Sequence, residues 1–320
     1  MQEPSGSYTG VRRELALELV HATEAAALAA ARLQGGGDEE RVHEVAGEAM
    51  RKVLEDSGLS GMVVLGSRSE SVLPPGTALT GVEPRLDFGL FPVEGAGQVA
   101  RGYANAVSIV AAVDPGGFVE LPAVWYAEKI VAGPAARGAV DLDDSIADNL
   151  RRIAFARDAR VQDLTVAVLD RPRHLELVAE VTAVGARIMT LEEGDIAGAI
   201  MAAMPGTGVD AAIGIGGLHA TLVAACAVRC LGGAFQARLW PRNDEEKALL
   251  SALPPRSYGV ADLLPAAEVA VAITGITGGQ LLPGVVFGSG YAESSSLLMS
   301  SRQATIRRLT TRHHMIGESS

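Results

Sequence analysis

Cysteines and long apolar runs are both scarce in this sequence. The only two cysteines, Cys226 and Cys230, stand four positions apart in an apolar segment of helical character. Two small buried hydrophobic residues explain such a pair better than a disulfide does, which favours a reducing, cytoplasmic location. No charged leader opens the chain, and no apolar run approaches the roughly 18 residues of a membrane span. We therefore expect no association with a membrane.

Positive charge is also in deficit. The 27 lysines and arginines are outnumbered by 38 acidic residues, which gives a net charge of -11. A protein that covers a nucleic-acid backbone needs clustered basic residues on one face, so we expect no nucleic-acid partner. Any anionic ligand must then be bound by a local basic pocket. With 48% hydrophobic residues, the chain can bury a substantial core.

Several well-known catalytic and metal-binding motifs are absent. The sequence has no H-E-x-x-H, no paired C-x-x-C and no G-x-S-x-G. A glycine turn at 214–217 resembles a dinucleotide-binding fingerprint only in part, because its final glycine would fall at His219. A nicotinamide or flavin cofactor is therefore not expected.

The pattern of apolar residues predicts a layered α/β protein. Residues 1–10 are polar and are expected to form a disordered tail. An N-terminal α+β subdomain is predicted over 11–160 and a C-terminal α/β subdomain over 161–320. The predicted helices are 11–34, 38–57, 145–157, 174–184, 195–203 and 218–230, and the predicted strands are 62–65, 86–91, 105–113, 118–131, 164–169, 186–190, 211–215, 269–274, 284–287 and 295–311.

Polar residues at strand ends are the candidates for binding and catalysis. Arg171 and Arg173 flank a proline directly after a predicted strand, where open α/β sheets place their ligands. Two planar guanidinium groups suit a phosphate or carboxylate, although a solvated basic loop is the alternative. Glu193 and Asp195 begin a predicted helix, and Asp195 is expected to cap it. Glu94 stands alone on a glycine turn after an apolar strand, and one carboxylate is too few for a metal pair.

Eight short stretches together resemble the class II fructose-1,6-bisphosphatases, a branch of the lithium-sensitive, metal-dependent sugar phosphatases. The resemblance extends from about residue 12 to residue 314 and implies an α/β/α/β/α layered sandwich that forms homodimers or homotetramers. The stretches are Arg12-Arg13-Glu14-Leu15-Ala16, Thr23-Glu24-Ala25-Ala26, Tyr126-Ala127-Glu128-Lys129, Ala147-Asp148-Asn149-Leu150-Arg151, Arg171-Pro172-Arg173-His174, Gly214-Ile215-Gly216-Gly217, Thr274-Gly275-Ile276-Thr277 and Thr305-Ile306-Arg307-Arg308.

The metal ligands that the resemblance implies are mostly replaced. The family's metal-binding Asp, acidic turn, motif Asp, motif Thr and late Glu correspond here to His43, 66–69, Phe91, Ala96 and Ala220. Glu94 alone remains, so we expect no metal cofactor, with a residual magnesium or manganese ion as the alternative. A single carboxylate cannot offset the lost hydration of two divalent ions.

The sugar and phosphate contacts that the resemblance implies are retained. They correspond to Tyr126, Arg171, Arg173, Glu193, Asp195 and Gly217, with Glu193 in place of a family Asp. The expected partner is therefore a phosphorylated sugar or cyclitol.

Three functions remain open from the sequence. The first is non-hydrolytic acid/base chemistry on that ligand, of isomerase, epimerase or lyase type, with Glu94 and His43 as the catalytic residues. The second is a binding or regulatory paralogue without catalysis. The third is a single-metal phosphatase that uses Asp38, His43 and Glu94.

Overall fold

The computed structural model describes residues 13–67, 71–81, 85–254, 256–265 and 268–315. The predicted tail at 1–10 lies outside these residues, so it stays a prediction.

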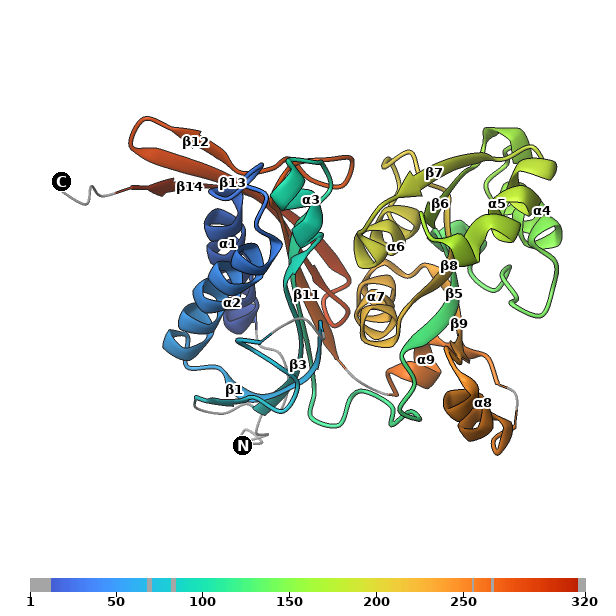
Figure 1. Ribbon diagram of the computed structural model, residues 1–320, viewed down its shortest axis with the longest axis horizontal. Coiled ribbons are helices and arrows are strands. Elements are labelled where there is room, and N and C mark those ends of the chain that lie inside the picture. The colour runs from blue at the N-terminus through green and yellow to red at the C-terminus, as the bar shows by residue number, and fades with distance from the viewer. Residues whose placement is uncertain (1–12, 68–70, 82–84, 255, 266–267, 316–320) are drawn as a thin grey trace, which may run out of the picture.

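Two mixed sheets form the centre of the fold (Figure 1). The first sheet has the order β12-β13-β11-β4-β3-β1-β2, and β14 also pairs with β13. Its strands are β1 (Ser60–Gly66), β2 (Ala78–Thr80), β3 (Arg85–Glu94), β4 (Val107–Val113), β11 (Val269–Gly275), β12 (Val286–Gly288), β13 (Tyr291–Ser300) and β14 (Thr305–His314). The second sheet has the order β10-β9-β5-β8-β6-β7. Its strands are β5 (Tyr126–Ala132), β6 (Thr165–Leu169), β7 (Arg187–Leu191), β8 (Ala211–Gly217), β9 (Ala234–Trp240) and β10 (Tyr258–Gly259).

Helices cover both outer faces and separate the two sheets, which confirms the predicted α/β/α/β/α sandwich (Figure 1). The outer face of the first sheet carries α1 (Arg13–Ala31) and α2 (Glu39–Asp56), and α6 (Asp195–Ala203) and α7 (Leu218–Leu231) lie between the sheets. The far face of the second sheet carries α4 (Ile146–Ala156) and α5 (Leu175–Ala183). The remaining helices are α3 (Ala96–Arg101), α8 (Asp244–Ser251), α9 (Val260–Leu263), η1 (Pro134–Ala136), η2 (Val161–Asp163) and η3 (Pro172–His174).

Alternation along the strands divides the apolar residues among three cores. In β4, Ile109 packs toward α6 and α7, whereas its neighbour Val110 packs toward α1 and α2. In β5, Val131 belongs to the core between the sheets and Ile130 to the outer core with α4 and α5. Because successive side chains point to opposite faces, Lys129 of the same strand points into the layer between the sheets.

Some element boundaries differ from the prediction. The predicted strand 295–311 is two strands of a hairpin, β13 and β14, whose turn contains Ala304 with φ 47°. No glycine or proline marks that turn, so the sequence reads as one strand. Of the predicted strand 118–131, only the part from Tyr126 is strand, and α3 was not predicted at all. The chain leaves the first sheet before β5 and returns to it at β11, and the predicted subdomain boundary near 160 stays a prediction.

Two expectations about the apolar segments can be compared with the structure. Cys226 and Cys230 are both free thiols on α7, as predicted. Within the ranges given above, no helix is long and apolar enough to cross a lipid bilayer.

Candidate functional site

Glu94 is the last residue of β3, and its carboxylate is bonded to the first turn of a helix. Its Oε1 accepts a hydrogen bond from the Ile196 N–H at 2.7 Å, and its Oε2 accepts one from the Ala197 N–H at 3.0 Å. Both donors belong to α6, whose N-cap residue is Gly194 and has no side chain to serve as a cap. Glu94 therefore caps α6 from a distant strand, and the expectation that Asp195 would cap this helix is wrong.

The turn after Glu94 requires glycine. Gly95 has φ 93°, and a Cβ placed on it would lie 2.3 Å from Oε1 of Gln98. This tight turn leads directly into α3, and it follows the residue of β3 that is bonded to α6.

Burial controls the protonation of Glu94. Loss of hydration raises the pKa of this carboxyl from 4.5 to about 7, against the lowering effect of the Ile196 and Ala197 N–H groups. The negative charge of Asp195 raises the pKa further, and Lys129 lowers it. Near neutral pH, both the acid and the carboxylate of Glu94 are populated.

Asp195 is held by a buried ion pair. Lys129 is 3% exposed, and its Nζ donates to both carboxylate oxygens of Asp195, at 2.6 and 2.7 Å. The strand β8 comes very close on the other side, since a Cβ on Gly216 would lie 1.8 Å from Asp195 Oδ2. Much of the carboxylate of Asp195 is thus engaged inside the protein.

Four residues at one end of the second sheet form what we call the arginine edge: Tyr126, Arg171, Arg173 and Gly217. In the sheet register, Tyr126 lies opposite Gly217 on one side and Trp240 on the other. Residues opposite one another point to the same face, and the Tyr126 and Trp240 rings meet edge to face at 6.0 Å. Gly217 adds no bulk beside the tyrosine ring.

Arg173 is fixed in place at this edge. Its guanidinium lies over the Tyr126 ring at 4.8 Å, and its Nη2 donates to the Ile215 carbonyl at 2.9 Å. Burial lowers the pKa of Arg173, Tyr126 and Asp195 oppose that effect, and the positive charge of Arg171 adds to it. Both arginines follow β6, so their guanidinium groups lie at the same edge of the second sheet.

Glu193 connects the arginine edge with the helices of the first sheet. Its Oε1 lies 3.6 Å from Arg101, and a Cβ on Gly97 would lie 2.5 Å from the same oxygen. Burial raises the pKa of Glu193, as does the charge of Glu39, whereas Arg101 and Arg171 lower it. Glu193 thus lies between α3 of the first sheet and the charge of Arg171 at the arginine edge.

His43 is half buried on α2, which covers the outer face of the first sheet, whereas Glu94 ends β3 and bonds to α6. Both Glu94 oxygens are bonded to α6, and the charged neighbours that shift its pKa are Asp195 and Lys129. The prediction that Glu94 and His43 form a catalytic pair stays a prediction.

The residues near Glu94 do not fit a divalent metal pair. Phe91 and Ala96 are buried and offer no oxygen or nitrogen ligand, and Ala220 offers none either. Across the part of the chain that the structure describes, no group of three or more His, Cys, Asp and Glu side chains could hold a metal ion. Glu94 itself uses both oxygens to accept backbone hydrogen bonds. The Glu94 carboxylate therefore caps α6, and the side chains around it do not supply the oxygen ligands that Mg²⁺ requires.

Three site residues were not identified from the sequence. Lys129 holds Asp195, Trp240 packs on Tyr126, and Arg101 lies beside Glu193. A signal existed only for Lys129, because it stands next to the apolar residues Ile130, Val131 and Ala132, and a buried base needs a partner.

Comparisons with known proteins match nearly the whole length of the chain. Residues 13–313 match the family model described as bacterial fructose-1,6-bisphosphatase, glpX-encoded. A D-fructose 1,6-bisphosphatase class 2/sedoheptulose 1,7-bisphosphatase of Synechococcus sp. (strain JA-2-3B'a(2-13)) is 34% identical, over 95% of this chain and 97% of that protein. The fructose-1,6-bisphosphatase 1 class 2 of Escherichia coli (strain K12) is also 34% identical, over 95% of this chain and 96% of that protein.

Proposed function

Because this chain belongs to the glpX-encoded family of bacterial fructose-1,6-bisphosphatases, we propose that it binds a phosphorylated sugar or cyclitol at the arginine edge. The observation that carries the proposal is Arg173, held over Tyr126 and bonded to Ile215 beside Arg171. Two positioned guanidinium groups supply paired N–H donors to phosphate oxygens. The names of the relatives, which act on bisphosphorylated sugars, support the same ligand class.

We further propose that the reaction leaves the phosphate attached. The metal site of the family is degenerate here, and two-metal hydrolysis needs several carboxylates to hold its ions. Glu94 has a pKa of about 7, which suits a group that gives and takes protons at neutral pH. Isomerisation, epimerisation and elimination are reactions that such a group can promote, with His43 as its partner.

A binding or regulatory protein without turnover is the second candidate. The favouring observation is that both Glu94 oxygens are bonded to Ile196 and Ala197, at 2.7 and 3.0 Å. A carboxylate in that position stabilises α6 by satisfying two of the backbone N–H groups in its first turn. The arginine edge keeps its binding role in either case.

A residual magnesium- or manganese-dependent phosphatase is the third candidate, and the geometry favours it least. Asp38, one of its three proposed ligands, caps α2 by accepting a hydrogen bond from the Arg41 N–H at 2.9 Å. Addition of either ion to metal-free protein is expected to change neither its melting temperature nor its activity.

Calorimetric titration with a panel of hexose and heptulose phosphates tests the binding proposal. We expect binding without added metal, and a loss of at least about tenfold in affinity for Arg173→Ala, the effect of removing a charge-assisted hydrogen bond. Arg160→Ala is the matched control, because Arg160 is 79% exposed and pairs only with Asp163 among the residues described. Equal affinities of wild type and Arg173→Ala across the panel would refute the proposal.

The same panel separates the candidate reactions. Loss of the sugar phosphate without release of orthophosphate, followed by ³¹P NMR, supports acid/base chemistry. Binding without any loss supports the regulatory role, and release of orthophosphate in step with turnover contradicts both.

Two further expectations belong to this proposal. A homodimer or homotetramer is expected, and sedimentation velocity measures it directly. The cytoplasm is the expected location, because the two free thiols of Cys226 and Cys230 suit a reducing compartment.

A further inference from the structure

A cavity of about 630 Å³ lies at the opposite end of the second sheet from the arginine edge. It is lined by the segment after η1, the last turn of α7, the start of β9 and the short elements β10 and α9. Three elements connect it with the arginine edge, because β5 and α7 begin at that edge and β9 ends there. With 14 residues in α7, the two places are about 20 Å apart.

Two arginines give this cavity a positive charge. Arg137 is exposed and forms no ion pair with any residue in the described ranges, and Arg229 donates to the Leu264 carbonyl rather than to a carboxylate. Asp262, the one acidic residue of the lining, is already bonded to Arg256 at 2.6 Å and to the Gly259 N–H at 2.9 Å. In a chain with a net charge of -11, two arginines without carboxylate partners in one cavity indicate an anionic ligand.

The end of α7 explains only one of these arginines. A positive charge in the last turn of a helix is stabilised by the helix dipole, which accounts for Arg229. Arg137 lies on a separate segment after η1, where no such effect acts on it. Binding of one anionic ligand by both side chains explains why Arg137 and Arg229 line the same cavity.

The rest of the lining suits a phosphate group joined to an apolar body. Gln236 accepts a hydrogen bond from the Leu142 N–H at 2.8 Å through Oε1, so its amide nitrogen remains as a donor. Ser257 contributes a hydroxyl group, and the half-buried Val260 contributes apolar surface. The volume lies within the range of small-molecule sites, of about 300–1,000 Å³.

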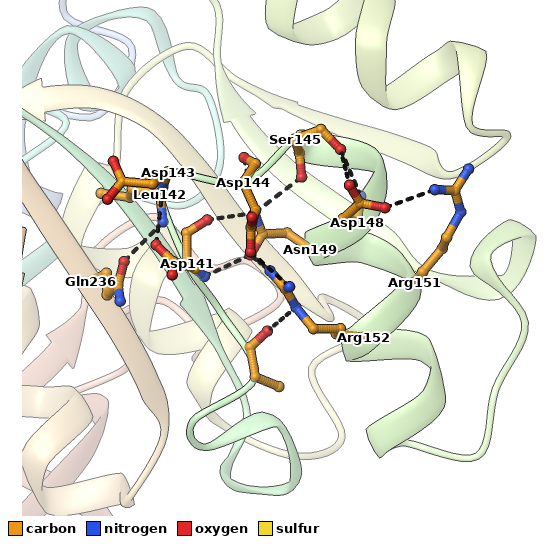
Figure 2. A network of polar contacts seen from close by, with 11 residues as sticks. Asp141, Leu142, Asp143, Asp144, Ser145, Asp148, Asn149, Arg151, Arg152 and Gln236 are labelled. Carbon is orange, nitrogen blue, oxygen red and sulfur yellow. Dashed lines mark hydrogen bonds and ion pairs between the residues drawn. The ribbon is translucent and has the colours of Figure 1, made fainter.

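The segment that follows Arg137 in the chain is held in place by a network of hydrogen bonds, shown in Figure 2. Asn149, which is 1% exposed, accepts from the Asp141 N–H at 2.8 Å and donates to the Asp141 carbonyl at 2.7 Å. Arg152 donates to the Ala139 carbonyl at 2.7 Å, directly after the cavity residue Gly138. A wall fixed in this way lowers the entropy cost of ligand binding.

We infer that this cavity is a second anion site, which binds a phosphorylated small organic molecule through Arg137 and Arg229. It is separate from the arginine edge and does not depend on the function proposed for that edge.

Titration calorimetry with phenyl phosphate tests the inference on the full chain, in wild type and in the Arg171→Ala/Arg173→Ala variant. Binding persists in the double variant, because the cavity does not use those arginines. Arg137→Ala and, separately, Arg229→Lys each weaken that binding by at least about tenfold. The lysine keeps the charge and can still reach the Leu264 carbonyl, so it removes the paired donors without leaving that carbonyl unbonded.

Arg160→Ala is the control for loss of one exposed positive charge, and it leaves the affinity unchanged. Thermal denaturation of each variant checks that the fold is kept, and Arg137→Ala carries little risk because Arg137 is exposed. Wild-type affinity in both Arg137→Ala and Arg229→Lys overturns the inference, as does complete loss of binding in the Arg171→Ala/Arg173→Ala variant. Orthophosphate binding as tightly as phenyl phosphate overturns the assignment of an organic ligand.

Discussion

The arginine edge and the Glu94 turn lie on either side of α6, yet their polar groups are arranged in opposite ways. At the arginine edge, Arg173 is fixed by a ring and one carbonyl, and the guanidinium of Arg171 donates only to the carbonyl of Asp170, at 2.7 Å, among the described residues. At the turn, both Glu94 oxygens are already bonded inside the protein. Donors kept for a ligand indicate binding, whereas acceptors used by the fold indicate a structural role. The difference teaches that a retained acidic residue need not retain its chemistry.

The largest expected effect is on the ion pair between Lys129 of β5 and Asp195 of α6. Lys129→Ala leaves the Asp195 carboxylate mostly buried without its cation, which we expect to lower the free energy of unfolding by about 3–5 kcal/mol. Urea denaturation measures this. The double variant Lys129→Met/Asp195→Leu replaces the pair by apolar groups and should lose much less. A loss below about 1 kcal/mol for Lys129→Ala would show that Asp195 is free for a ligand.

The next effect concerns the pH dependence of stability. The folded state raises the pKa of Glu94 from 4.5 to about 7, so between these values the folded protein holds more protons than the unfolded chain. The contribution of Glu94 to the free energy of unfolding is therefore fully present below pH 4.5. It decreases by on the order of 3 kcal/mol as pH rises through 7. Denaturant unfolding at a series of pH values should show this decrease in wild type.

Glu94→Gln is the control for that prediction, since the amide does not titrate. Its stability relative to wild type should improve as pH rises from 5 to 8, whatever the cost of its weaker helix cap. Parallel pH profiles of the two proteins would contradict the account of Glu94 as a buried, proton-binding cap.

A smaller effect is expected where β8 approaches Asp195. Gly216→Ala places a Cβ 1.8 Å from Asp195 Oδ2, and such overpacking costs about 1–3 kcal/mol. Gly133→Ala is the matched control, because its Cβ would meet only the Ala202 carbonyl at 3.7 Å. Equal melting temperatures for the two variants would mean that Asp195 moves away easily.

The smallest effect separates a helix cap from a metal ligand. Asp38→Ala removes the cap of α2 and should cost about 1 kcal/mol, while Asp38→Asn keeps the hydrogen bond and should cost little. Manganese should alter the thermal stability of neither variant nor of wild type. Stabilisation of wild type alone by manganese would assign Asp38 to a metal site.

The sequence predicts the layers better than the site. Helix 195–203 and strands such as β11 follow from apolar periodicity, because each buries one or both of its faces in a continuous core. The sequence does not indicate the turn between β13 and β14, because the residue with a positive φ in that turn is Ala304 rather than a glycine. Local patterns identify elements, but they do not mark every turn.

The role of Glu94 could not be predicted, because its partners are backbone N–H groups 102 and 103 residues further along the chain. The same holds for Lys129 and Asp195, which meet only after β5 and α6 are packed together. Residue type indicates that a carboxylate can cap a helix or hold a metal, and only the three-dimensional arrangement decides between the two.

A crystal soaked with a hexose bisphosphate and Mn²⁺, measured at the manganese absorption edge, tests the central claim most directly. The account predicts an intact phosphorylated sugar against Arg171 and Arg173, with no anomalous peak at the Glu94 carboxylate. Manganese bound to Glu94, with orthophosphate cleaved from the sugar beside it, would contradict the account.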